Sequence, residues 1–149
     1  MRIHDSIWFD IAEFVDSRVL RILKENAAFM VDPKIVRVCD LLRELSGKPT
    51  TVNNWSWGGI YDSSGFRAIW DKTGGTLSQH RCGRGADAKV RDFTPKMVHE
   101  LILDNSAKFE DAGLTTLEHL DFTPSWSHLD VRPRIKGWHP KVGILIVKP

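Results

Sequence analysis

The sequence predicts an α+β fold, because helix-like and strand-like segments follow one another without a regular strand–helix alternation. Apolar residues in the first third of the chain recur at helical spacing, and the last third contains three short runs that are typical of strands. The 149 residues are enough for one domain with its own core. We therefore expect a single domain over residues 1–149, in which helices flank a small antiparallel sheet.

The N-terminal part, residues 1–48, is expected to be helical. From Ile7 to Leu23, apolar residues recur near a 3.6-residue period, which predicts a first helix. Asp32 followed by Pro33 is typical of an N-cap and the first turn of a second helix, and Gly47 is suited to end it. We expect the apolar faces of both helices to pack in the core, and we assign them no chemistry.

The character of the chain changes after Pro49. Residues 50–55, TTVNNW, favour a short strand, and residues 56–75 are rich in glycine without periodicity, which predicts a long loop. The loop carries several aromatic side chains, and we expect Trp57 and Tyr61 to form one wall of a binding site. Tryptophans can stack on sugars or peptides, but a place in the core is an equal alternative for three of them: Trp8, Trp55 and Trp138.

Strands and one further helix are expected in the remaining chain. Residues 85–90, GADAKV, read as a strand, and Thr94 with Pro95 is typical of the start of a helix that we expect to reach about Phe109. After Gly113 three segments favour short strands: residues 115–120, 126–131 and 143–147.

Composition and charge exclude several classes of protein. Hydrophobic residues make up 42% and charged residues 27%, which is ordinary for a globular domain. The net charge of +2 comes from interspersed basic and acidic residues, so we expect no nucleic-acid partner. Cys39 and Cys82 form neither a CxxC pair nor a disulfide framework, and we expect free thiols in a reducing cytoplasm.

No membrane or export segment is expected. Charged residues such as Arg2, Asp5 and Asp10 interrupt the apolar runs at the N-terminus, so we expect no signal peptide and a protein that is cytoplasmic on synthesis. The longest apolar run, GILIV at residues 143–147, is far too short to cross a bilayer.

Two histidines and an aspartate are the candidates for a metal site. His80 ends the glycine-rich region, and Asp87 lies seven residues later in a predicted strand. His128 and Asp130 lie two apart in another predicted strand, so their side chains face the same side. Two imidazoles and a carboxylate are a suitable ligand set for catalytic zinc, with a fourth position open for water. A structural role for each histidine remains the alternative, because spacing alone is a weak signal.

The surrounding sequence strengthens this interpretation. Residues 78–87, SQHRCGRGAD, resemble the S-x-H-x-x-G-x-A-x-D signature of the zinc D-Ala-D-Ala carboxypeptidases and related phage endolysin peptidases. Gly85 stands where this family usually has alanine. Residues 64–67, SGFR, resemble the family's S-G-[YF]-R segment, and residues 127–133, SHLDVRP, look like the segment with the second histidine. The three segments occur in the family's order over roughly residues 49–133.

The resemblance implies a fold and a set of roles. It implies the fold of the hedgehog signalling domain, with residues 49–149 as the metal-binding core and one Zn²⁺ held by His80, Asp87 and His128. Arg67 matches the family arginine that contacts the substrate carbonyl, where a guanidinium also stabilises developing negative charge. We expect Ser78 to shape the loop beside the substrate rather than to react, since no base is patterned for it.

The general base is where the chain departs from the family. Many members have an acid three residues before the second histidine, but Ser125 occupies that position here. We favour Glu118, because its strand can pair with that of His128, and Asp121 is the alternative base. Asp130 is expected instead to orient a metal ligand or Arg132.

Other candidate residues are set aside. His99 and Glu100 begin an H-E-x-x-H pattern, but Leu103 ends it, and we expect His99 on a helix surface. Cys82 lies between two ligands in the sequence without needing to face the metal. His119 alternates with Glu118 along a strand, so we expect it to face away from the site.

The sequence thus predicts a zinc-dependent peptidase that hydrolyses peptidoglycan stem peptides, as a carboxypeptidase or as an endolysin-type endopeptidase. A phage or prophage origin is expected, with a holin or a virion delivering the protein to the cell wall. The alternative, supported by Ser125, is a non-catalytic module of the same fold that keeps the zinc and serves in binding or in a virion.

Overall fold

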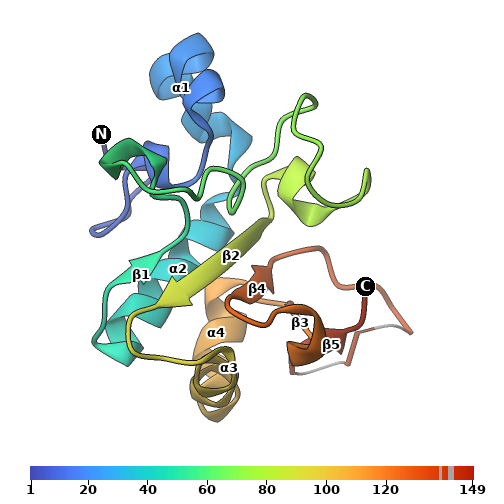
Figure 1. The fold of residues 1–149 in the computed structure, drawn as a ribbon. Coiled ribbons are helices and arrows are strands. Elements are labelled where there is room, and N and C mark those ends of the chain that lie inside the picture. Colours follow the sequence, from blue (N-terminus) through green and yellow to red (C-terminus); the bar gives the residue numbers. More distant parts are fainter. Residues whose placement is uncertain (138, 141–142) are drawn as a thin grey trace.

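The computed structural model shows an α+β fold and describes residues 1–137, 139–140 and 143–149. Trp138, for which we considered a place in the core, lies outside these residues. Within the described part, a five-stranded sheet is backed by helices, and the N-terminal segment packs beyond one end of it (Figure 1). No helix there is long and apolar enough to cross a membrane.

The helices follow the capping signals of the sequence. Asp32 accepts a hydrogen bond from the backbone N–H of Lys34, and Gly47 ends the helix with a left-handed backbone, which confirms the predicted second helix. Four α-helices are described in the resolved ranges: α1 (Ser17–Leu23), α2 (Pro33–Ser46), α3 (Pro95–Asp104) and α4 (Ser106–Ala112). Short 3₁₀ helices are η1 (Ile11–Glu13), η2 (Lys24–Met30), η3 (Trp55–Trp57), η4 (Gln79–Cys82) and η5 (Leu120–Phe122).

The first predicted helix was wrong in its extent. Instead of one helix from residue 7 to residue 23, the chain forms η1 and then α1. Asp16 has an extended backbone, and its side chain accepts a hydrogen bond from the Val19 N–H, so it begins a new helix. The apolar residues at helical spacing are buried nevertheless, because Ile11, Phe14 and Val15 belong to the core.

The third predicted helix is divided. Asn105 interrupts it between α3 and α4, and its side-chain amide donates to the backbone oxygen of Leu101. His99 on α3 is 5% exposed, so its predicted place on the helix surface was wrong. The physical reason is that α3 packs on the sheet with the face that carries Val98, His99 and Ile102.

The sheet has the order β1-β2-β4-β3-β5 and is mixed. β1 with β2, β2 with β4 and β4 with β3 are antiparallel, whereas β3 and β5 are parallel. The predicted all-antiparallel sheet was therefore wrong at β5. β5 lies next to β3, on the side away from β4. It begins at the same end of the sheet as β3, where β4 finishes, and therefore runs parallel to β3. The strands are β1 (Thr50–Thr51), β2 (Gly85–Val90), β3 (Thr116–Glu118), β4 (Ser127–Asp130) and β5 (Leu145–Val147).

The two faces of the sheet have different chemistry. On one face, Ala86, Leu129 and Leu117 lie in one row across β2, β4 and β3, and all are fully buried. α2 packs against this half of the sheet and lies behind β2 in Figure 1. Because side chains alternate along a strand, the next residues face the opposite side. These are Asp87 and His128, which are paired directly across β2 and β4.

Candidate metal centre

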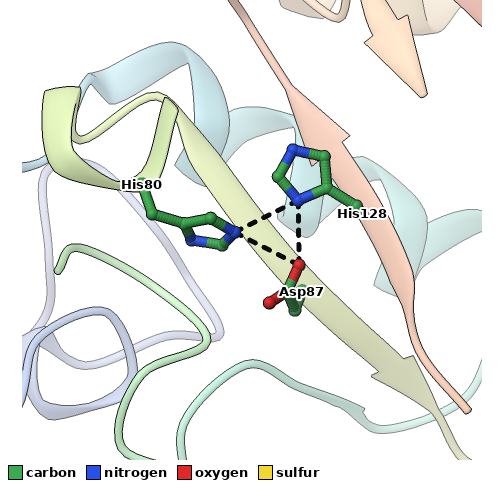
Figure 2. A group of neighbouring side chains, drawn as sticks. All are labelled: His80, Asp87 and His128. Atoms are coloured by element: carbon green, nitrogen blue, oxygen red, sulfur yellow. Dashed lines mark hydrogen bonds and ion pairs between the residues drawn. The ribbon is translucent and has the colours of Figure 1, made fainter. Parts of the chain in front are cut away.

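His80, Asp87 and His128 form a compact triangle on the face of the sheet opposite the helices (Figure 2). His80 Nε2 lies 3.1 Å from His128 Nδ1 and 3.2 Å from Asp87 Oδ1. His128 Nδ1 lies 2.9 Å from the same carboxylate oxygen. All three residues are at least nine-tenths buried. The structure therefore brings the three predicted ligands together.

The turn before β2 holds His80 in place. Ser78 caps η4, and its hydroxyl accepts a hydrogen bond from the backbone N–H of His80. Ser78 also lines the hollow described below. The Nδ1–H of His80 donates to the Gly65 backbone oxygen at 2.7 Å, so the Nε2 lone pair faces Asp87 and His128.

Asp130 orients His128 from the other side of the imidazole. His128 Nε2 lies 3.4 Å from Asp130 Oδ2, which leaves Nδ1 directed at the triangle. Asp130 is completely buried and is held in turn by Arg132, whose Nε donates to Oδ1 at 2.8 Å. A carboxylate behind a histidine ligand fixes both the tautomer and the ring orientation. Asp130 thus occupies the position expected of a residue that supports a ligand.

Arg67 provides the corresponding support for Asp87. Its Nη2 donates to Asp87 Oδ2 at 2.8 Å, and Oδ1 remains directed at the histidines. The loop before it is fixed along β2, since the Asp87 N–H donates to Ser64 O and the Arg67 N–H donates to His80 O. Arg67 is 9% exposed and stands beside the triangle, where its Nη1 has no hydrogen-bond partner among the described residues.

The charges of this group favour a cation at its centre. Burial opposes ionisation of Asp87, but its close contacts with His128 and His80 hold the pKa of this carboxyl well below its usual range. Burial also opposes a charged His128, yet hydrogen bonds to Asp130 and Asp87 outweigh it and raise the pKa of His128 to about 9. Burial lowers the pKa of His80. The ionised Asp87 carboxylate suits a cation, and a metal ion has to displace the proton of His128, because histidine binds metal as the neutral imidazole.

The geometry of the donors fits a small, tetrahedrally coordinated ion. Bonds of about 2.0–2.1 Å place the ligand atoms of such an ion about 3.3 Å apart. The three sides of the triangle, at 3.1, 3.2 and 2.9 Å, come within a few tenths of an ångström of this value. Gly85 leaves room beside it, since a Cβ there would lie 3.2 Å from His128 Cε1. The group can therefore hold a metal ion with only small movements.

The triangle lies in a hollow of about 670 Å³. His80, Asp87 and His128 line it together with Glu118 and Arg67. The register explains the position of Glu118: Leu117 pairs with Leu129, so Glu118 comes next along β3, opposite His128. Burial raises the pKa of Glu118, while the nearby His128 opposes this rise. Among the described residues that line the hollow, Glu118 is thus the acid that is not itself part of the triangle.

Two predicted site residues lie elsewhere. Asp121 is exposed and pairs with His119 Nδ1 at 3.2 Å, outside the residues that line the hollow. The reason is that the chain leaves β3 after Glu118 and turns into η5. Trp57 is 64% exposed and lines a separate hollow beside Met1, so it does not form a wall of this site. As expected, His119 does not line the hollow.

Tyr61 lies next to the larger hollow but does not line it. It lines a smaller hollow, which shares Arg67, Asp87 and Trp126 with the larger one. Sequence reasoning missed Trp126, which directly precedes β4 and lines both hollows, and His139, whose Nε2 lies 3.2 Å from Thr116 Oγ1. The position of Trp126 two residues before His128 was a usable signal, because alternate strand residues share a face.

Gly83 offers a test of how closely the turn after His80 packs against the rest of the protein. Its φ is +67°, and a Cβ there would lie 2.0 Å from the Met30 backbone oxygen. We expect Gly83→Ala to lower the free energy of unfolding by about 2–4 kcal/mol, since left-handed strain and a backbone clash add. Gly58→Ala is the matched control, because Gly58 has φ +82° but open space around it. Denaturant unfolding of both variants should show the larger loss at Gly83, and equal losses would contradict the clash.

Comparison of the chain with protein-family models, with curated proteins and with solved structures gives no match. The resemblance to zinc peptidases therefore rests on the three short segments at residues 64–67, 78–87 and 127–133. The structure brings residues of all three together, since Arg67, His80, Asp87 and His128 lie side by side.

Proposed function

We propose that this protein is a zinc-dependent peptidase that hydrolyses peptidoglycan stem peptides. The observation that carries the proposal is the triangle of His80, Asp87 and His128, which lies in a hollow beside Glu118 and Arg67. A base and a cation next to a three-ligand metal site are the parts that hydrolysis of an amide needs. The three sequence segments support the substrate class and a hedgehog-like fold for the α+β domain.

Zinc suits this donor set of two imidazole nitrogens and one carboxylate oxygen, which leaves a fourth position open. When bound, zinc polarises the scissile carbonyl and lowers the pKa of water toward neutrality. His80 and His128 are prepared for binding by their hydrogen bonds to Gly65 and Asp130, which leave one nitrogen of each ring directed at the site. The protein therefore needs little reorganisation to hold the ion.

Glu118 is the residue we assign to proton transfer. Its carboxylate lies across the strand pair from His128 and faces the hollow. It accepts the proton of the attacking water and delivers it to the nitrogen of the leaving amine, so that the amide bond breaks without releasing a strong base. The burial that raises the pKa of Glu118 makes it a better proton acceptor than an exposed glutamate.

Arg67 is assigned to the carbonyl oxygen of the substrate. Its Nη2 and Nε are held by Asp87 and by the Ser63 backbone oxygen, so the guanidinium is fixed before substrate binds. The Nη1 group lacks a hydrogen-bond partner among the described residues and is available to the developing negative charge. Fixed donors of this kind need no rearrangement during the reaction.

A phage or prophage origin remains part of the proposal, with a holin or a virion providing access to the cell wall. The function is tested by incubating zinc-loaded protein with muropeptides and following cleavage by mass spectrometry, with and without a chelator. We expect release of D-alanine or a divided stem peptide, and we expect chelator to abolish it and added zinc to restore it.

The alternative function makes a different prediction in the same assay. If the protein is a non-catalytic zinc module, it will bind about one equivalent of zinc and cleave no wall peptide. Ser125, in place of the usual acid, is the feature that favours this alternative. Its exposed position outside the hollow leaves Glu118 to provide the carboxylate.

A further inference from the structure

A second hollow lies beyond Asp87, next to the hollow at the metal centre. Its volume is about 300 Å³, and both hollows are lined by Arg67, Thr73, Asp87 and Trp126. These shared residues lie between the two spaces, so the carboxylate of Asp87 and the guanidinium of Arg67 border both. The metal centre therefore has one hollow on each side of the pair formed by Asp87 and Arg67.

The far wall of the second hollow is a fixed aromatic surface. The Lys89 ammonium lies 4.2 Å from the centre of the Tyr61 ring. Three oxygens hold that ammonium: Ser64 Oγ at 2.8 Å, the Asp87 backbone oxygen at 2.9 Å and the Val52 backbone oxygen at 3.3 Å. Since Lys89 is anchored in this way, it fixes the ring of Tyr61 in turn. The wall is thus formed before any ligand arrives.

In the other direction, the larger hollow crosses the sheet. Asp87, His128 and Glu118 lie on β2, β4 and β3, and Val147 pairs with Glu118 on β5. Three strand spacings of about 4.8 Å give roughly 14 Å from Asp87 to Val147, which equals about four residues of an extended peptide. Apolar side chains also line the larger hollow, namely Phe122, Ile135, Leu145 and Val147.

We infer that the substrate is an extended peptide that occupies both hollows, so that the bond cut is internal and Tyr61 contacts the part beyond Asp87. The inference rests on the peptidase function proposed above and selects endopeptidase over carboxypeptidase action. A carboxypeptidase needs a site that ends within about one residue of the scissile bond and binds a terminal carboxylate. Here a hollow is found on each side of the metal centre, and the Tyr61 wall of the second one is held by Lys89.

The experiment uses the full chain loaded with zinc and a set of stem-derived peptides with acetylated N-termini and amidated C-termini. Mass spectrometry first locates the bond that is cut, and the peptides are then shortened one residue at a time from either end. We expect blocked peptides to be cleaved internally. We also expect kcat/KM to fall at least about tenfold when the second or third residue on either side of the bond is removed.

Tyr61→Ala tests the second hollow, and Trp57→Ala is the matched control, since Trp57 is an exposed aromatic of the same loop in a separate hollow. We expect Tyr61→Ala to raise KM about tenfold for long peptides and to leave peptides truncated on that side unchanged. Binding is measured separately by titrating uncut long peptide into Glu118→Gln and into Glu118→Gln with Tyr61→Ala. The second protein should bind about tenfold more weakly.

The possible results distinguish this inference from the peptidase function on which it rests. Release of a single terminal residue, with blocked peptides left intact, would overturn the two-sided site while the peptidase function stands. Equal effects of Tyr61→Ala on long and truncated peptides would also overturn it, because a structural defect acts on both. Failure of zinc-loaded protein to cleave any peptide would instead reject the peptidase function itself.

Discussion

Glu118→Gln is expected to lower kcat by about 100-fold to 10,000-fold, which is the usual contribution of a general base. Glutamine has nearly the same shape as glutamate but accepts no proton from water at neutral pH. Because Glu118 is outside the triangle formed by His80, Asp87 and His128, zinc binding should stay near one equivalent. Initial rates on a muropeptide and zinc content by atomic absorption measure the two effects separately.

Asp121→Asn provides the matched control for this variant. Asp121 lies three residues further along the chain and was the alternative base, but its carboxylate pairs with His119 outside the hollow. We expect its kcat to stay within about twofold of the unsubstituted protein. A Glu118→Gln protein that retains its full rate would disprove the assignment of the base. A loss confined to Asp121→Asn would transfer the role to that residue.

His80→Ala is expected to abolish stoichiometric zinc binding. The imidazole supplies one of only three protein ligands, and the remaining pair, Asp87 and His128, cannot enclose an ion. In the unsubstituted protein, zinc at about 100 times its Kd should add about 2.7 kcal/mol to the free energy of unfolding, or roughly 8 °C in Tm. The variant should show no such shift and less than about 0.1 equivalent of bound zinc.

His119→Ala controls for the loss of a histidine as such. His119 is part-exposed, pairs with Asp121 and does not line the hollow. It should keep both the bound zinc and the thermal shift. If His80→Ala still bound one equivalent with an unchanged shift, the metal would be held elsewhere and the triangle would lose its assigned role.

The zinc-induced shift also separates metal binding from folding. His80→Ala removes a buried side chain that donates to Gly65, so the variant is expected to be less stable than the unsubstituted protein even without metal. The relevant quantity is therefore the difference in Tm with and without zinc for each protein, and not the Tm itself.

Several features of the fold were readable from local signals. The start of α2 at Asp32 and Pro33 and its end at Gly47 follow from capping chemistry, which involves only neighbouring residues. β2 was predicted with its correct bounds, Gly85–Val90. The first helix was predicted too long because the apolar residues keep a 3.6-residue period on both sides of Asp16, so periodicity does not reveal that a new helix begins there.

The all-antiparallel sheet was wrong for a different reason. The direction of β5 depends on which strand it joins, and β5 has only three residues, Leu145–Val147. So short a run carries no sequence pattern that distinguishes a parallel neighbour such as β3 from an antiparallel one. The same limit applies to His99, whose burial depends on how α3 packs on the sheet.

The sequence by itself identified the candidate metal ligands. His80, Asp87 and His128 were identified from short motifs, because ligand types and spacings are local properties of the chain. Only the tertiary structure distinguishes the positions of Glu118 and Asp121, since strand register places the first opposite His128 and the turn after β3 directs the second outward.

The tertiary structure also decided where the loop aromatics lie. Tyr61 lines the second hollow together with Arg67 and Asp87, whereas Trp57 lines a different hollow. The two aromatic residues are only four positions apart in the same loop. No periodicity relates side chains in irregular backbone, so their directions follow from contacts with distant segments. For this protein, the candidate ligands are encoded locally, while the positions of the proposed base and of the walls of the site are set by packing across the sheet.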